Sequence, residues 1–228
     1  MRDHVLPGDP PVPVRLLRSG RARRLSLRIS GADGRVTLTL PLRARVSDGL
    51  AFLREREAWL RGHLAQAPQP VLPEFGAAIP FEGRLLTLAP QDGRGARIDG
   101  DRLLLPPDPA RLAPRLSAFL RAAARDRLAA ACDRHAAALG RPYRRLTLRD
   151  PRSRWGSCTA QGDLMFSWRL VLAPPAVLDY VCAHEVAHLA HLDHSPAFWA
   201  CVERLRPGWR AERAWLRTDG AGLHRLRL

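Results

Sequence analysis

The densest group of side chains that can bind metal is HEVAHLAHLDH, residues 184–194. On an α-helix, residues four apart lie one above the other, so the imidazoles of His184 and His188 can converge on one ion. Glu185 points to another side of the helix, where its carboxylate can hold a metal-bound water without being a ligand. Zinc would activate that water and polarise a scissile carbonyl, while Glu185 would take the proton and pass it to the leaving amine. The pattern predicts a zinc-dependent hydrolase, with a metallopeptidase as the leading hypothesis.

A catalytic zinc site needs a third protein ligand and keeps one position open. We favour His194, which follows the expected end of the helix and directly precedes Ser195-Pro196, a pair typical of the start of the next helix. Two alternatives stay open. Glu203 would lie on that next helix, and His191 would face the ion only if the first helix ended early.

Other residues near this segment have both a functional and a packing interpretation. Tyr180 lies one turn before His184 and could donate a hydrogen bond to an oxyanion, although packing is commoner at that offset. Asp179 and Glu203 are candidates for hydrogen bonds to ligand imidazoles. Cys158 has no neighbouring base in the sequence, so we expect a packing or loop-shaping role.

Helices and short strands are expected to position these residues. A helix from Pro174-Pro175 to about Leu192 would carry the histidine pair, and the next would run from Ser195-Pro196 through Leu205. Upstream, an Ala/Arg/Leu-rich segment predicts a long helix that stops at Gly140. Strands are expected at 146–148 and 164–172, with a glycine-containing loop at 154–158 between them.

The first half of the chain is richer in alternating patterns. A hairpin is expected around Asp33-Gly34, and a second hairpin or short meander around Asp99-Gly100. Between them, apolar residues at helical spacing over 52–64 predict an amphipathic helix that Ser47 can cap. We therefore expect a flexible tail at 1–14, a β-rich region at 15–108 and a catalytic region at 109–220. The whole of 15–220 could also count as one domain.

The charge of the chain is high but uneven. Its 228 residues include 37 basic and 22 acidic residues, a formal net charge of +15, and every basic residue is arginine. Lysine and asparagine are both absent, which reflects a GC-rich genome and makes the charge weaker evidence for nucleic-acid binding. Residues 1–150 hold 27 arginines against 15 acids, whereas residues 151–228 hold 10 against 7.

Composition also excludes several classes of protein. With 46% hydrophobic residues the chain can build a real core and is not globally disordered. No apolar run approaches the about 18 residues that cross a bilayer, and no signal-peptide segment is present. The four cysteines are dispersed, as expected for reduced thiols. We expect a soluble, cytoplasmic bacterial protein that does not associate with membranes.

Residues 154–199 resemble the YgjP-like metallopeptidase family, also called the domain-of-unknown-function 45 family and related to SprT-like zincins. The resemblance is carried by three motifs: His184-Glu185-Val186-Ala187-His188, Asp193-His194-Ser195-Pro196-Ala197-Phe198-Trp199 and Trp155-Gly156-Ser157-Cys158. It implies that His184, His188 and His194 bind Zn²⁺ and that Glu185 is catalytic. Asp193 stands where the family usually has asparagine, which fits a chain that contains none.

The resemblance implies an α+β fold, in which a β-rich N-terminal region precedes a compact zincin-like metallopeptidase core with an H-E-x-x-H active helix. It covers residues 15–220 loosely and 154–199 specifically. In zincins an edge strand near the metal pairs with an extended substrate. Residues 164–172 are a candidate for that region, although their apolar character on both faces equally suits a buried strand.

Two other functions are kept beside the metallopeptidase. The basic N-terminal half could associate weakly with a nucleotide or nucleic acid, which would make the protein a metal-dependent nucleotide phosphohydrolase or a protease acting on nucleic-acid-bound protein. Residues 15–28, however, lack the spaced aromatic residues of a single-strand binding platform, and we favour a solvated sheet face. The third function is a non-enzymatic, zinc-stabilised binding module, whose metal would be closed by four protein ligands. The sequence does not identify the peptide or protein substrate.

Overall fold

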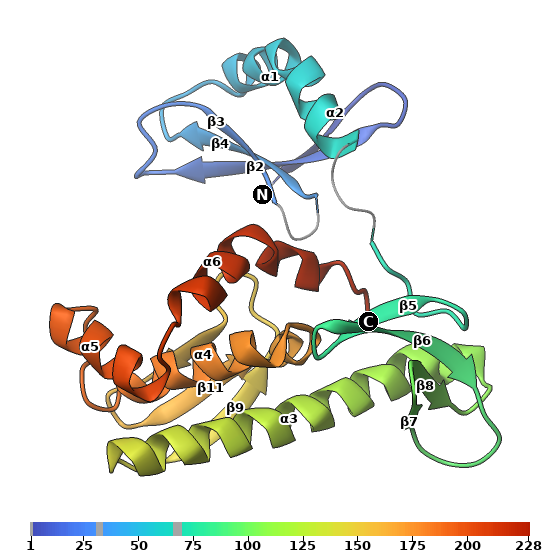
Figure 1. The fold of residues 1–228 in the computed structure, drawn as a ribbon. Helices are drawn as coiled ribbons and strands as arrows, with labels where there is room; N and C mark the ends of the chain where they lie inside the picture. The colour runs from blue at the N-terminus through green and yellow to red at the C-terminus, as the bar shows by residue number, and fades with distance from the viewer. Residues whose placement is uncertain (1, 31–33, 66–69) are drawn as a thin grey trace. The chain divides into compact units, whose positions relative to one another are not determined.

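The computed structural model describes residues 2–30, 34–65 and 70–228, which form two compact units, Met1–Pro70 and Val71–Leu228 (Figure 1). Each unit contains both helices and strands and has its own hydrophobic core, so the expected α+β class is confirmed. The division at 70/71 differs from the expected one at 108/109. Strands before the proline-rich break at 106–109 and the helix after it share one core, because residues such as Leu88, Leu103 and Leu116 are buried together.

The first unit is built on a four-stranded sheet. Its strands are β1 (Arg2–Leu6), β2 (Val12–Ser19), β3 (Ser26–Ile29) and β4 (Val36–Pro41), in the order β1-β2-β4-β3. The central pair β2 and β4 is parallel, and the outer pairs are antiparallel. The expected β3–β4 hairpin is confirmed, although Asp33 of its turn lies outside the described residues.

Residues 2–14 are not the flexible tail that was expected. They contribute β1 and the start of β2, and Leu6 and Val12 are buried in the core. The guanidinium of Arg61 also donates hydrogen bonds to the carbonyls of Pro7 and Pro10, which ties the β1–β2 connection to a helix. Burial and these hydrogen bonds compensate for the entropy lost on ordering the segment.

The single helix expected over 52–64 is two helices, α1 (Val46–Glu55) and α2 (Glu57–Ala65), which meet at Arg56. Arg45 rather than Ser47 precedes the first turn, and no side chain caps it. Leu53 and Leu60 carry the apolar stripe and are buried in the first unit's core.

The second unit begins with another four-stranded sheet, made of β5 (Ala78–Phe81), β6 (Arg84–Pro90), β7 (Arg97–Asp99) and β8 (Arg102–Leu105). Its order is β5-β6-β8-β7, with a parallel central pair and antiparallel outer pairs, as in the first unit. The expected turn at Asp99-Gly100 joins β7 to β8.

A long helix and a three-stranded sheet follow. The 3₁₀ turn η1 (Pro109–Arg111) leads into α3 (Leu112–Leu139), which ends where Gly140 adopts the left-handed conformation at φ 71°, as expected. The strands are β9 (Arg145–Arg149), β10 (Gly156–Cys158) and β11 (Asp163–Ser167), in the order β10-β11-β9. β10, in the segment expected to be a loop, is therefore an edge strand.

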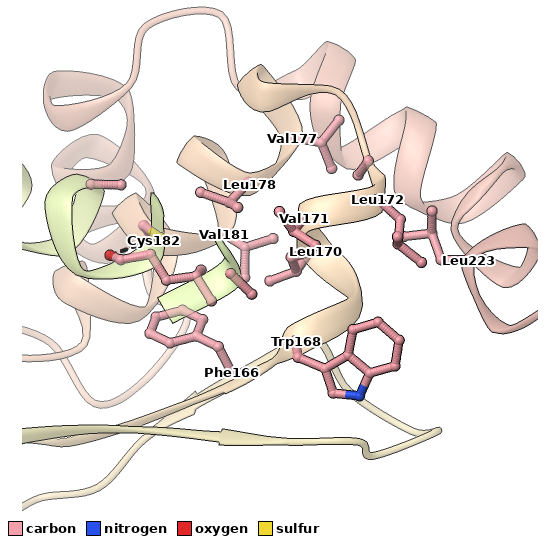
Figure 2. Packing of buried hydrophobic residues seen from close by; sticks show 14 of the residues in the cluster. Phe166, Trp168, Leu170, Val171, Leu172, Val177, Leu178, Val181, Cys182 and Leu223 are labelled. Atoms are coloured by element: carbon pink, nitrogen blue, oxygen red, sulfur yellow. Dashed lines mark hydrogen bonds between the residues drawn. The ribbon is translucent and has the colours of Figure 1, made fainter. Parts of the chain in front are cut away.

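The strand expected over 164–172 ends at Ser167, and Trp168–Leu172 form the 3₁₀ turn η2. Figure 2 shows its side chains gathered in the core with residues of the following helix. Arg169 is buried within this turn, where it pairs with Asp150 through two hydrogen bonds and donates to the carbonyls of Leu223 and Leu226. All five residues of η2 are buried, so apolar residues continue past Ser167 without a change in pattern. The sequence therefore contains no signal for the end of the strand.

The remaining elements are α4 (Pro175–Ala187), α5 (Pro196–Leu205), α6 (Arg210–Thr218) and the 3₁₀ turn η3 (Gly220–His224). The α4 helix packs against α3, α5 and α6, so the histidine-bearing segment lies within the second unit's core (Figure 1). Among the described residues, no helix is both long and apolar enough to cross a membrane.

Candidate metal centre

Three of the sequence-predicted histidines converge at the end of α4. The ligand atoms offered by His184, His188 and His194 all lie within 4.8 Å of one another, an arrangement that could hold a metal ion. Of the two alternatives for the third ligand, neither His191 nor Glu203 belongs to this group. His194 comes instead from the connection between α4 and α5.

The end of α4 orients His188. The helix stops at Ala187, before the expected end near Leu192, and the chain continues in a turn over 188–190. The early stop places the main-chain oxygen of His191 2.9 Å from Nδ1 of His188. Because a carbonyl only accepts, Nδ1 must carry the proton, which leaves the Nε2 lone pair free for an ion. Arg141 supports the turn by donating to the carbonyl of Leu189 at 2.9 Å.

The start of α5 positions His194. The hydroxyl of Ser195 accepts a hydrogen bond from the Phe198 amide, so Ser195 caps the helix as expected. The carboxylate of Asp193 accepts from the Ser195 amide at 3.2 Å. Hydrogen bonding to the side chain of Ser195, followed by that to its amide, keeps the pKa of Asp193 below its usual value. Together these local contacts fold the connection back towards α4.

The spacing between the imidazoles of His184 and His194 fits a transition-metal ion. Nε2 of His184 and Nε2 of His194 lie 3.2 Å apart. Two nitrogens each about 2.05 Å from one tetrahedral ion would lie about 3.3 Å apart. Burial, followed by the neighbouring His188 and His194, lowers the pKa of His184 to about 3, so its imidazole is neutral and offers a lone pair. Neutral imidazoles are the form that ligates divalent transition metals.

Glu185 follows His184 on α4 and is buried, with 6% of its surface exposed. Burial raises the pKa of its carboxyl to about 8, and the charge of Arg154 acts in the opposite direction. A divalent cation bound to the histidines would also favour the charged carboxylate. The predicted base is therefore buried directly after the first predicted ligand on α4, in a place where water has little access.

A glycine allows β10 to approach Glu185. A Cβ added to Gly156 would lie 2.6 Å from both Cγ and Oε1 of Glu185, closer than real contacts allow. The Trp155-Gly156-Ser157-Cys158 motif is part of the family resemblance, which assigns no role to its glycine. The structure gives it one, since only glycine lets the edge strand pack directly on the carboxylate.

Three aromatic residues, Tyr180, Phe198 and Trp199, contact the histidines, and together with Trp209 they are here called the aromatic wall. The ring of Phe198 stacks on His188 with centroids 4.4 Å apart, and Tyr180 meets His184 edge-on at 6.0 Å. Tyr180 and Trp199 each stack on Trp209. These contacts support the packing interpretation of Tyr180.

The other residues that were weighed lie elsewhere. Asp179 binds His135, Arg134 and Arg206 and makes no hydrogen bond to the three histidines. Glu203 accepts from the Gly208 amide and from Arg210. Burial, followed by the charge of Glu185, raises the pKa of Cys158 to about 11, which disfavours the thiolate and any nucleophilic role.

Comparison with known proteins assigns the family. The model of the YgjP-like metallopeptidase domain matches residues 23–219, most of the chain. The chain belongs to the YgjP-like family. Among solved structures, this YgjP-like chain is similar to the metallopeptidase zymogen of Pyrococcus abyssi abylysin, at 24% identity and a TM-score of 0.35. That similarity covers 46% of this chain and 99% of abylysin. No curated protein matches significantly.

Proposed function

We propose that this YgjP-like protein is a zinc-dependent metallopeptidase. His184, His188 and His194 would bind Zn²⁺, and Glu185 would be the general base and acid. The observation that carries the proposal is the convergence of three imidazoles at the end of α4, where a buried carboxylate, Glu185, directly follows the first of them in the chain. Membership of a metallopeptidase family supports the same reaction class.

The donor set suits catalytic zinc. Three imidazoles are a common ligand set of catalytic zinc, and they leave a fourth position open. When bound, zinc supplies a Lewis acid that polarises a carbonyl and makes water an effective nucleophile near neutral pH. The protein fixes the ligands locally: the His191 carbonyl holds the proton on His188 Nδ1, and the Ser195 cap holds the start of α5.

Glu185 would move the proton. Its carboxylate would accept a proton from the attacking water and donate it to the nitrogen of the leaving amine. Burial favours the protonated form of this group and a bound cation would favour its charged form, and the two proton transfers use both forms. Gly156 would keep the carboxylate in place by bringing the β10 backbone directly against it.

The edge strand next to Glu185 is the best place for an extended substrate. Residues 164–167 of the expected segment form β11, which has β10 on one side and β9 on the other. Among the strands that the structure describes, β10 pairs with β11 alone, and an added peptide strand can hydrogen-bond to the other edge of such a strand. We therefore assign substrate pairing to residues 156–158.

A pocket follows the end of β10. It has a volume of about 480 Å³ and is lined in part by Thr159, Gln161, His188 and Leu189. Because His188 forms part of its wall, a substrate side chain bound there would lie next to the predicted metal ligands. The pocket supports peptide binding across the site.

Two variants test the proposal. Glu185→Gln should retain stoichiometric zinc but lose hydrolysis, and His188→Ala should lose both. Zinc content would be measured by elemental analysis, and activity on a panel of peptide, nucleotide and DNA-bound protein substrates. Full activity of Glu185→Gln on a substrate that the wild type cleaves would refute the mechanism.

The same panel separates the alternatives. Turnover of nucleotides only would favour a phosphohydrolase, and salt-sensitive DNA binding would favour a protease acting on nucleic-acid-bound protein. A zinc ion closed by a fourth protein ligand would favour the binding module.

We also propose a cytoplasmic location, supported by four free cysteines.

A further inference from the structure

The α6 helix places one arginine against the aromatic wall. Cζ of Arg213 lies 4.8 Å from the ring centroid of Trp199 and 5.7 Å from that of Trp209. The Trp199 centroid in turn lies 5.6 Å from that of His184 and 5.8 Å from that of His194. Arg213 therefore packs over Trp199, which contacts two of the three predicted ligands.

The charge of Arg213 has no carboxylate partner within the described parts of the chain, whereas its neighbours are paired. Arg210 also lies over Trp209, at 4.8 Å, but pairs with Glu203 at 2.9 Å. Arg206 pairs with Glu212 at 2.7 Å. Arg213 is exposed, so its charge remains available to a ligand.

Stacking prepares the guanidinium for an anion. Cζ of Arg213 lies over the rings of Trp199 and Trp209, and these cation–π contacts limit the freedom of the side chain. Its N–H groups lie in the plane of the guanidinium and are not consumed by stacking. A planar donor fork of this kind matches the two oxygens of a carboxylate.

A carboxylate bound to Arg213 would lie near the predicted metal ligands, because Arg213 packs over Trp199 and the Trp199 ring contacts His184 and His194.

We propose that Arg213 binds a carboxylate of the substrate, so that the enzyme prefers acidic peptides. This inference rests on the proposed function, because it treats the metal centre as a peptidase site. The carboxylate comes from an aspartate or glutamate side chain or from the free C-terminus of the peptide, and both present the same pair of oxygens. Arg213 is then a specificity-determining residue, and the metal ligands are untouched by its replacement.

Three peptides of one length test this preference on the zinc-loaded full chain. The first carries one glutamate and an amidated C-terminus, the second replaces that glutamate with glutamine, and the third is the glutamine peptide with a free C-terminus. The preference is the ratio of kcat/KM for a carboxylate peptide to that for the amidated glutamine peptide. Arg213→Gln should reduce this ratio for one or both carboxylate peptides by about 5- to 20-fold, which is the effect expected from losing one partly exposed charge-assisted hydrogen bond. The first and third peptides distinguish the two sources.

Arg210→Gln is the matched control, because it removes a guanidinium from the same helix and the same indole but one that is already paired. It should leave the preference within twofold, and Arg213→Lys should keep part of it. Zinc content and melting temperature would be compared for all variants. An unchanged preference in Arg213→Gln, or an equal change in Arg210→Gln, would overturn the inference.

A binding measurement separates this inference from the peptidase itself. Fluorescence anisotropy of the three labelled peptides would be followed with zinc-loaded Glu185→Gln protein, with and without Arg213→Gln. If no peptide is cleaved by the wild type but the carboxylate peptides bind more tightly through Arg213, the peptidase proposal fails and the carboxylate site stands. If all three peptides bind equally with Arg213 present, the carboxylate site is refuted whatever the activity.

Discussion

The contact between Gly156 and Glu185 makes a sharp prediction for Gly156→Ala. The added methyl carbon would lie 2.6 Å from Cγ and Oε1 of Glu185 and 2.8 Å from Cδ. Ordinary contacts between such atoms are about 3.5–4.0 Å, so the carboxylate or the strand must move by about 1 Å. The φ of Gly156 is not in the left-handed region, so alanine adds bulk without backbone strain.

Two quantities should change by different amounts. Overpacking of a buried contact costs about 1–3 kcal/mol, which lowers the melting temperature by about 2–4 °C per kcal/mol. A general base displaced by about 1 Å loses about 100-fold in kcat. Zinc content should not change, because the methyl group contacts the base and not the three histidines.

The assay would combine peptide turnover, zinc stoichiometry and thermal unfolding. Gly222→Ala is the matched control in the same unit, because a Cβ there meets nothing within 4 Å. Near-wild-type kcat in Gly156→Ala would refute the argument that this glycine seats the base. Parallel loss of zinc and activity would show that the strand supports the ligands instead.

Three further predictions concern the metal and the polar contacts of the second unit. Treatment with a chelator should abolish hydrolysis, and added Zn²⁺ should restore it in an activity assay, whereas activity unaffected by metal removal would contradict a metal mechanism. Arg169→Met should lower the free energy of unfolding by about 2–4 kcal/mol in urea, because two buried carbonyls and Asp150 lose their donor; a change below 1 kcal/mol would contradict this. Burial would raise the pKa of Asp179, but hydrogen bonding from His135 and the charges of nearby arginines hold that pKa below the usual 3.8. This carboxylate therefore stabilises the fold above pH 3.8, and the stabilisation is lost as the pH falls through the pKa of the folded state. Asp179→Asn should therefore cost about 1–3 kcal/mol at pH 7, with the difference from wild type shrinking in urea titrations below pH 3.8.

The sequence predicted the group of histidines because local spacing controls it. On a helix, His184 and His188 must share a face, and the Ser195-Pro196 cap signals where the next helix begins. Both signals operate over a few residues and need no knowledge of the rest of the chain. For the same reason Gly140 marked the end of α3 correctly.

Features that depend on tertiary contacts were harder to predict. The end of α4 depends on Arg141, 48 residues before the carbonyl of Leu189 that it binds. The strand over 164–172 could not be divided at Ser167, because every residue of the 3₁₀ turn is buried and the alternation disappears. Residues 2–6 gave no strong signal, and Arg61 helps to order the connection after them from far along the chain.

The residues that hydrogen-bond to the predicted ligands could not be predicted from the sequence either. Asp179 has the right chemistry and is close in sequence, but His135 on α3 and Arg206 after α5 take its two oxygens. Nothing in the sequence shows which carboxylate a distant arginine will meet. The role of Gly156 likewise requires knowing that β10 lies against α4, although the motif itself was visible.

The hydrogen bond from His188 to the main-chain oxygen of His191 changes how position 191 should be probed. Its side chain was considered as a ligand, yet its contribution to the site is an atom that every amino acid possesses. Alanine scanning would score this position as silent. Inserting or deleting one residue between 188 and 191 would instead move the carbonyl away and leave the Nδ1 proton of His188 without its acceptor. The length of this turn, rather than the identity of residue 191, therefore fixes the orientation of His188.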